Sequence, residues 1–115
     1  MPRKLSPQDL SDHAVELIAA RFKALSEPSR LKLIIALEEG GKNVTELVDA
    51  TGLTQANVSR HLQLLIESGI LARRKEGLTV IYSISDPAIF ELCEKVCGGI
   101  QKRLHHQTRA FEISK

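Results

Sequence analysis

The stretch TELVDATGLTQANVSRHLQLLIESG, residues 45–69, decides the fold of this 115-residue chain. A short helix begins at Thr45, Gly52 provides a tight turn, and Thr54 caps a longer helix, since hydroxyl side chains are preferred at helix N-termini. Two helices joined by a short turn that contains glycine form a helix-turn-helix unit. We place that unit at residues 45–68.

Two further helices are expected before this unit. Ser6-Pro7 combines a hydroxyl cap with proline at the first helical position, which predicts a helix over residues 7–25. Its apolar residues recur at steps of three and four: Leu10, Ala14, Leu17, Ile18 and Phe22. A second helix starts at Pro28 and ends at Gly40-Gly41, because glycine tolerates the left-handed conformation that follows many helices.

The hydrophobic period changes after the helix-turn-helix unit. Two short strands flank Glu76-Gly77, so a hairpin, or wing, is expected over residues 70–84. Asp86-Pro87 then begins a last helix over residues 87–108. The predicted architecture is mainly α with a small β-hairpin: a winged helix-turn-helix of about five helices and a two-stranded wing, in a single domain over residues 1–115.

Length and composition narrow the function. A chain of 115 residues with 43% hydrophobic and 26% charged residues is typical of one globular domain. A net charge of +2 does not by itself require a nucleic acid, so the placement of the charges has to decide that question. Aromatic residues make up 3% of the chain, which argues against stacking of single-stranded bases. No apolar run is long enough to span a bilayer and no signal peptide is recognisable, so we expect a cytoplasmic protein.

The helix after Thr54 presents the side chains that would read a base sequence. If the inward face consists of Val58, Leu62, Leu65 and Ile66, a rotation of about 100° per residue turns a polar set outward. That set contains amide, hydroxyl and guanidinium groups, which can pair with base edges in the major groove. The residues are Gln55, Asn57, Ser59, Arg60 and Gln63, with Thr54 at the helix start and His61 at the edge of the buried stripe, as a packing or phosphate-contacting residue. An ordinary polar helix surface is the alternative interpretation.

The expected wing carries three consecutive cations, Arg73, Arg74 and Lys75. Cations on a projecting hairpin suit contacts with phosphates or with a narrow minor groove. The alternative is an edge strand charged to resist aggregation. The position beside the reading helix favours the DNA interpretation.

Two cysteines, Cys93 and Cys97, are four residues apart and share one face of the last helix. One interpretation is packing, because cysteine behaves as a small hydrophobic residue. The other is a sensor for a soft metal or metalloid ion, or for a thiol-oxidising or sulfur species. In that case, two such pairs would meet near a dimer axis. His13, His105 and His106 are expected on the surface.

The segment from Phe22 to Ile84 resembles the ArsR/SmtB family of bacterial repressors. The matching residues, which keep the family's spacing, are Phe22–Leu31, Thr54–Leu62, Leu65, Ser68–Ile70, Arg73–Gly77 and Val80–Ile84. The resemblance implies a sequence-specific repressor, a homodimer joined by its first and last helices, that binds a pseudo-palindromic double-stranded operator and leaves it when an inducer binds. Two-fold pairing also follows from the small number of base pairs that one helix can read.

The chain departs from the family at the usual metal positions. Where many members carry a Cys-x-Cys pair, this chain has Asn43 and Thr45. At the four zinc positions of the last helix it has Asp86, Ala88, Gly99 and Lys102, and Asp86 is expected to cap the helix instead. Metal at these positions is therefore not expected, which leaves either the cysteine pair or an organic ligand as the inducer site.

The sequence argues against two other classes of function, an enzyme and a winged helix that binds only proteins. An enzyme is not expected, because no nucleophile with a base at a recognisable spacing, no glycine-rich phosphate loop and no metal-ligand cluster is evident. A winged helix that binds only proteins would not need a basic wing or a polar reading face without acidic residues.

Overall fold

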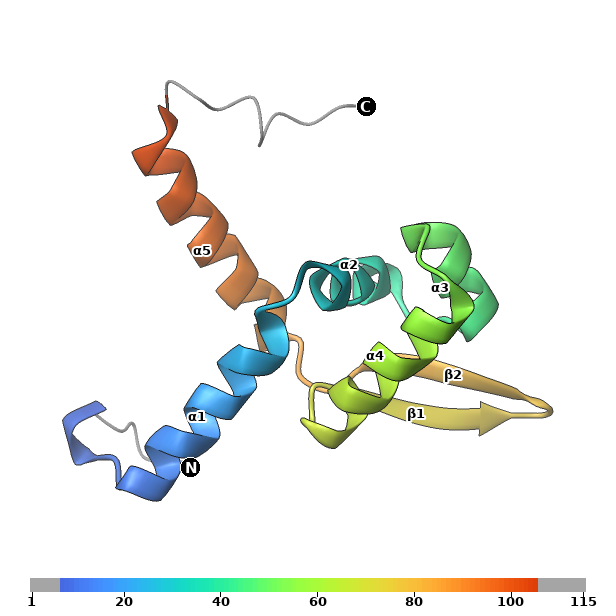
Figure 1. The fold of residues 1–115 in the computed structure, drawn as a ribbon, viewed down its shortest axis with the longest axis horizontal. Helices are drawn as coiled ribbons and strands as arrows, with labels where there is room; N and C mark the ends of the chain where they lie inside the picture. The colour runs from blue at the N-terminus through green and yellow to red at the C-terminus, as the bar shows by residue number, and fades with distance from the viewer. Residues whose placement is uncertain (1–6, 106–115) are drawn as a thin grey trace. The chain divides into compact units, whose positions relative to one another are not determined.

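The computed structural model describes residues 7–105, and the elements in that range follow the expected order (Figure 1). A 3-10 turn precedes the first helix, and a second such turn extends the next. The elements are η1 (Pro7–Asp9), α1 (Asp12–Leu25), α2 (Pro28–Ala36), η2 (Leu37–Glu39), α3 (Val44–Thr51), α4 (Gln55–Glu67), β1 (Leu71–Glu76), β2 (Thr79–Ile84) and α5 (Ala88–Arg103). The chain divides into two compact units, residues 1–85 and residues 86–115.

The first helix starts later than its sequence suggested. Ser11 is its N-cap, and the hydroxyl of that residue accepts a hydrogen bond of 3.1 Å from the backbone N–H of Ala14. The proline turn Pro7–Asp9 is a separate 3-10 element, so the prediction of one continuous helix from Pro7 is wrong. Ser6, the expected cap, lies outside the described residues. Both Ser6 and Ser11 precede the apolar repeat of this helix, so the repeat alone does not show which serine is the N-cap.

The third helix also starts at a different residue from the one predicted. Asn43, not Thr45, is its N-cap: the Asn43 side chain accepts from the N–H of Glu46 at 2.8 Å, and the Glu46 carboxylate accepts from the N–H of Asn43 at 2.9 Å. This reciprocal capping box satisfies two N–H groups that would otherwise lack partners. The prediction at Thr54 is confirmed, since its hydroxyl accepts from Asn57 N–H at 3.2 Å.

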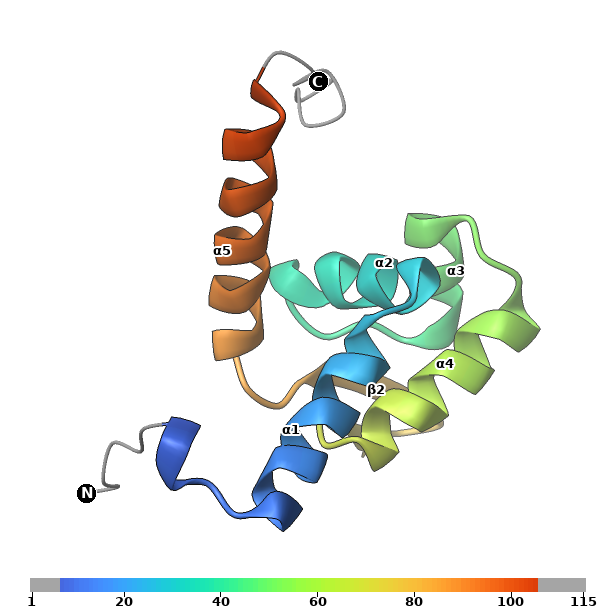
Figure 2. The same cartoon turned by 60° about the vertical axis from the view of Figure 1, so that its left-hand side comes forward.

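The core of the first unit lies where α2, α3, α4 and the start of β1 pack together (Figure 2). Its most enclosed side chains are Leu33, Ile34, Leu47, Val58, Leu62, Leu65 and Ile70. Each contributes about 1.5–3 kcal/mol by leaving water. This core fixes α4 against the other helices through one side only, and the opposite side of α4 stays exposed.

The hairpin is tied to the helices by a third, very short strand segment. β1 and β2 pair antiparallel with Glu76 opposite Thr79, so Gly77 and Leu78 form the turn, one residue later than the expected Glu76-Gly77. Lys42 bridges Tyr82 through two backbone hydrogen bonds of 3.0 and 2.9 Å. The wing is therefore anchored to the segment that leads into α3.

Gly41 makes the closest approach between this anchoring segment and the wing. A Cβ added at Gly41 would lie 2.6 Å from Ile81 Cγ2 and 3.3 Å from the carbonyl oxygen of Tyr82. Real Cβ atoms do not approach so closely, because the overlap is strongly repulsive. Only glycine therefore lets the backbone of this segment pass β2 at this distance.

The second unit contains α5. The Asp86 carboxylate accepts a hydrogen bond of 3.0 Å from the N–H of Ala88, the first residue of the helix. Pro87 is the N-cap residue of α5, so the prediction that Asp86 is the N-cap is wrong by one residue, although the Asp86 carboxylate still satisfies an N–H at the helix start. Of the predicted range 87–108, residues 106–108 lie outside the described part. Within residues 7–105, no helix has both the length and the apolar character that crossing a bilayer requires.

Candidate nucleic-acid interface and thiol pair

The exposed side of α4 forms a polar surface that starts at the helix N-terminus. Gln55, Ser59, Arg60 and Gln63 are exposed there, and we call these four residues the reading face. The first turn of α4 holds no acidic residue, and Glu67 is the first carboxylate along the helix. Free N–H groups and the positive end of the helix dipole lie at the same end and favour an approaching phosphate.

Two members of the reading face are held by neighbours on the same helix. Arg60 donates from Nη2 to Asn57 Oδ1 at 2.7 Å, and Gln63 donates from Nε2 to Glu67 Oε2 at 3.0 Å. Asn57 itself is half-buried. The side-chain carbonyl oxygen of Asn57 thus orients the guanidinium of Arg60, which is a different role from the base-edge contact expected from the sequence.

His61 lies on the buried side of α4, with 7% of its surface exposed. Its Nε2 is 3.8 Å from Oε1 of Glu27, the N-cap of α2. Burial lowers the pKa of His61, while the Glu27 carboxylate opposes that shift. This environment favours the packing interpretation over a phosphate contact. Ile66, expected in the buried stripe, is only half-buried, and His61 occupies the inward position instead.

Glu27 was not singled out from the sequence, although it joins two helices. Its carboxylate accepts the N–H of Arg30 at 3.0 Å, and that hydrogen bond is the main reason why the pKa of Glu27 is lowered. Arg30 in turn donates from Nε to the carbonyl of Ala24 at 2.6 Å, at the end of α1. The pattern Glu-Pro-x-Arg after an apolar helix was the available signal for this junction.

The three cations of the wing do not share one face. Residues opposite one another across a ladder point to the same side, so Arg73 with Tyr82 and Lys75 with Val80 occupy one face of the hairpin. Arg74, opposite Ile81, occupies the other.

Arg74 has an anionic neighbour that the other two cations of the wing lack among the described residues. Its Nε lies 2.7 Å from Glu76 Oε2. Both side chains are more than half exposed, so this pair stabilises the hairpin only slightly. Arg73 and Lys75 are therefore better candidates than Arg74 for phosphate contacts.

The two cysteines occupy one side of α5 and neither is in a disulfide. Both side chains are half-buried. Within residues 7–105, no group of three or more His, Cys, Asp or Glu side chains is close enough to hold a metal ion. A soft ion at Cys93 and Cys97 would therefore need further ligands from elsewhere, such as a second copy of the chain.

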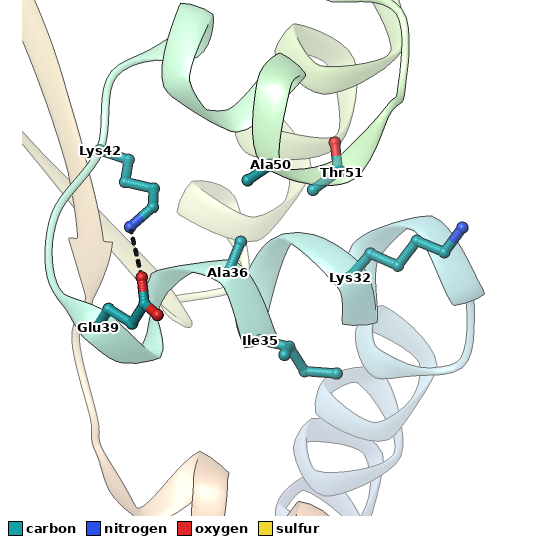
Figure 3. A pocket seen from close by; sticks show the side chains of 7 residues that line it. All are labelled: Lys32, Ile35, Ala36, Glu39, Lys42, Ala50 and Thr51. Carbon is teal, nitrogen blue, oxygen red and sulfur yellow. Dashed lines mark ion pairs between the residues drawn. The ribbon is translucent and has the colours of Figure 1, made fainter. Parts of the chain in front are cut away.

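A pocket of about 490 Å³ opens between α2 and α3 (Figure 3). Ala36 faces Ala50 and Thr51 across it, and Lys42 Nζ lies 3.6 Å from Glu39 Oε1 at one end. None of its lining residues belongs to α4, the hairpin or α5. The pocket is thus separate from both the reading face and the thiol pair.

Large apolar side chains remain exposed on α1. Leu17 is 59% exposed and Phe22 53%, and Val15 and Ile18 lie beside them. On α5, Val96, Ile100 and Leu104 are also exposed. Several exposed large apolar side chains on each of these helices favour a partner that covers them.

Comparison with known proteins agrees with this geometry. Residues 27–73 match the model of the family described as "Bacterial regulatory protein, arsR family". The chain is 37% identical over 71 residues to a probable mercury resistance operon repressor of Streptomyces lividans, which covers 62% of the chain and 57% of that relative. It is also 37% identical over 83 residues to the uncharacterized HTH-type transcriptional regulator Rv0081 of Mycobacterium tuberculosis, covering 71% of the chain and 73% of the relative.

Solved structures give the same result. The crystal structure of Rv0081 superimposes with a TM-score of 0.73 at 33% identity, over 85% of this chain and 99% of that one. A homodimeric winged helix-turn-helix DNA-binding domain, Mb0332 of Mycobacterium bovis, has a TM-score of 0.73 at 28% identity, over 85% of this chain and 94% of that one. The expectation of a winged helix-turn-helix is confirmed.

Proposed function

The chain belongs to the arsR family of bacterial regulatory proteins, and on that premise we propose that it is a dimeric repressor of transcription whose inducer is a soft metal or metalloid ion bound by Cys93 and Cys97. The family and its homodimeric, DNA-binding structural neighbour support DNA and a second copy of the chain as partners. The observation that carries the DNA-binding part is the reading face. It is polar, exposed and free of carboxylates up to Glu67, and it lies on a helix held rigidly by the core.

The reading face supplies contacts of two kinds. Gln55 and Arg60 carry the groups that pair bidentately with adenine and guanine, respectively, in the major groove. Ser59 and the cap residue Thr54 suit phosphate or single base-edge contacts. On the wing, Arg73 and Lys75 supply positive charge that would bind phosphates without regard to sequence. Two copies of this surface related by two-fold symmetry would read half-sites about one helical turn apart.

The exposed apolar residues of α1 and α5 support the dimer. Burying a leucine such as Leu17 from its 59% exposed state recovers part of the roughly 1.5–3 kcal/mol that full burial of this side chain provides. Several such residues on one helix make a two-fold interface favourable. A repressor with one reading helix per copy would lose most of its operator affinity if the dimer dissociated.

The thiol pair supports the proposed inducer by its chemistry and its position on the helix. Side chains four residues apart in a helix are neighbours, so both thiolates can reach one ion after each thiol loses its proton. Thiolates prefer soft ions, and the relative from Streptomyces lividans is named as a mercury resistance operon repressor. The ligand set would be completed by the pair of a second copy, because residues 7–105 of one chain supply no third ligand nearby.

The experiment that tests this proposal uses the full chain, purified without oxygen, on a duplex selected by the wild-type protein from a random library. Mercuric ion or arsenite is titrated while fluorescence anisotropy reports the bound DNA and ultraviolet absorbance reports thiolate–metal bonds. We expect the wild type to develop the absorbance and to release DNA. The paired variant Cys93→Ser/Cys97→Ser should bind DNA like the wild type and keep it.

A matched control separates sensing from packing. Cys93→Ala/Cys97→Ala keeps a small apolar side chain at both positions and should behave like the serine pair. Lys95→Gln changes an exposed polar side chain of the same helix, touches neither a thiol nor the apolar residues, and should release DNA like the wild type. If a folded double variant releases DNA with the same reagent and at the same concentration as the wild type, the cysteines are packing residues. The inducer would then be a ligand of another kind.

A further inference from the structure

The tip of the wing carries an apolar side chain that the fold does not use. Leu78 is 100% exposed, whereas the next most exposed large hydrophobic residue among those described, Leu17, is 59% exposed. It follows Gly77, which adopts a φ of 63° and thereby allows the two-residue turn. Leu78 buries nothing against the protein, so its identity does not stabilise the hairpin.

We propose that Leu78 is an apolar wedge that enters the minor groove of the operator next to the major groove read by α4. This inference rests on the proposed function, since it requires that α4 binds duplex DNA. Apolar side chains that enter the minor groove partly unstack a base step and bend the duplex toward the major groove. Leu78 would therefore contribute to affinity and to DNA shape rather than to base pairing.

The dimensions of the wing fit this role. Leu71 is buried at the base of β1, and every residue from Ala72 to Thr79 is exposed, so the hairpin projects from the helices (Figure 1). Five steps from Leu71 to Glu76, at about 3.3 Å each, give a projection of about 17 Å. Half of a DNA turn is also about 17 Å, which is the offset between a major groove and the adjacent minor groove. A minor groove about 6 Å wide excludes a helix but admits a narrow turn.

The charges around the tip favour DNA as the partner of Leu78. Arg73 and Lys75 precede the turn on one face of the hairpin, and the Arg74–Glu76 pair at 2.7 Å occupies the other face. The cations would hold the phosphates on either side of the groove, while the neutral tip enters between them. The hairpin cannot swing freely, because Lys42 and Tyr82 bind its second strand to the loop before α3.

The test compares full-length variants on the selected duplex, labelled at both ends so that energy transfer reports bending. Leu78→Ser should bind about tenfold more weakly than the wild type, which corresponds to about 1.4 kcal/mol, and should bend the duplex less. Leu78→Met keeps an apolar tip and should restore both affinity and bend. Ile35→Ser removes a large apolar side chain that is 58% exposed on α2, away from the wing, and should change neither.

Hydroxyl-radical footprints give a second readout at the proposed point of contact. The wild type should protect sugars of the minor groove beside each half-site, and Leu78→Ser should expose them. Guanine N7 atoms of the half-sites, which lie in the major groove, should stay protected from methylation by dimethyl sulfate in both proteins. Wild-type affinity, bend and footprint for Leu78→Ser would overturn the wedge but leave the proposed function intact. Failure of the wild type to select any duplex would overturn the proposed function and the wedge together. Loss of binding to anionic phospholipid vesicles by Leu78→Ser, with unchanged DNA binding, would assign the tip to a membrane instead.

Discussion

Asn57 and Arg60 should act as one reading unit, and a double-mutant cycle measures whether they do. The structure joins them by a hydrogen bond of 2.7 Å from Arg60 Nη2 to Asn57 Oδ1. Arg60→Ala removes a guanine contact and should cost about 1–3 kcal/mol of binding free energy. Asn57→Ala leaves that contact available but no longer oriented, and should cost about 0.5–1.5 kcal/mol, the net value of an ordinary hydrogen bond.

The binding free energy of the double variant Asn57→Ala/Arg60→Ala decides whether the two residues act together. If Asn57 acts through Arg60, its removal in the Arg60→Ala background costs nothing further, and the coupling energy equals the whole Asn57 effect, about 0.5–1.5 kcal/mol or roughly 2- to 13-fold in affinity. Anisotropy titrations on the selected duplex and on duplexes with single base changes measure all four corners. Gln63→Ala serves as the control, because Gln63 is held by Glu67 instead.

Additive effects would refute this reasoning. If Asn57→Ala costs the same in both backgrounds, and the loss appears at a different base pair from that of Arg60→Ala, then Asn57 contacts a base independently. Thermal unfolding of each variant checks that the α4 helix remains intact, since the backbone N–H of Asn57, which donates to the Thr54 hydroxyl, is retained in alanine.

Two further predictions concern assembly and pH. Leu17→Glu places a charge on the exposed apolar face of α1, so it should convert the dimer to a monomer, as measured by sedimentation. Operator binding, measured by anisotropy, should be lost in the same concentration range. A monomeric variant that keeps full affinity would contradict the dimer requirement. Burial lowers the pKa of His61 in the folded state below its ordinary value of 6.5, so the unfolded chain binds the proton more readily. The free energy of unfolding should therefore be highest above pH 6.5 and decrease as the pH falls below that value. Urea unfolding between pH 5 and 7 measures that decrease, which His61→Leu should remove; an unchanged pH dependence in this variant would assign the effect to another group.

The order of elements was predictable because it is encoded locally. Thr54, the glycine turns and the change from a helical to an alternating pattern after Gly69 each act over a few residues, and the structure follows them. The errors occurred where two neighbouring residues could perform the same local task. Ser11 caps α1 although Ser6 precedes a proline, and Asn43 caps α3 although Thr45 is a good cap as well. Tertiary packing decides between such candidates, and a single sequence does not display it.

The site was predictable to the level of a helix face but not of individual contacts. Spacing along α4 identified the exposed set, yet the Asn57–Arg60 bond depends on rotamers that no spacing rule specifies. His61 and Glu27 come from different helices, so their proximity at 3.8 Å required the fold. The opposite faces of Arg73 and Arg74 follow from the alternation of side chains along a strand. Their cross-strand partners required the strand register, which the sequence placed one residue too early at the turn.

The bridge between Lys42 and Tyr82 fixes the distance between the wing and the helix-turn-helix. Because backbone atoms, and not side chains, form this bridge, substitutions on the surface leave that distance unchanged. The wing and α4 would then contact the duplex at two points a fixed distance apart. Changes of base identity between these two contacts would be tolerated far better than an inserted or deleted base pair, which shifts one contact along the DNA helix and rotates it about the axis. The length of the operator spacer, more than its composition, would then be the property on which selection acts.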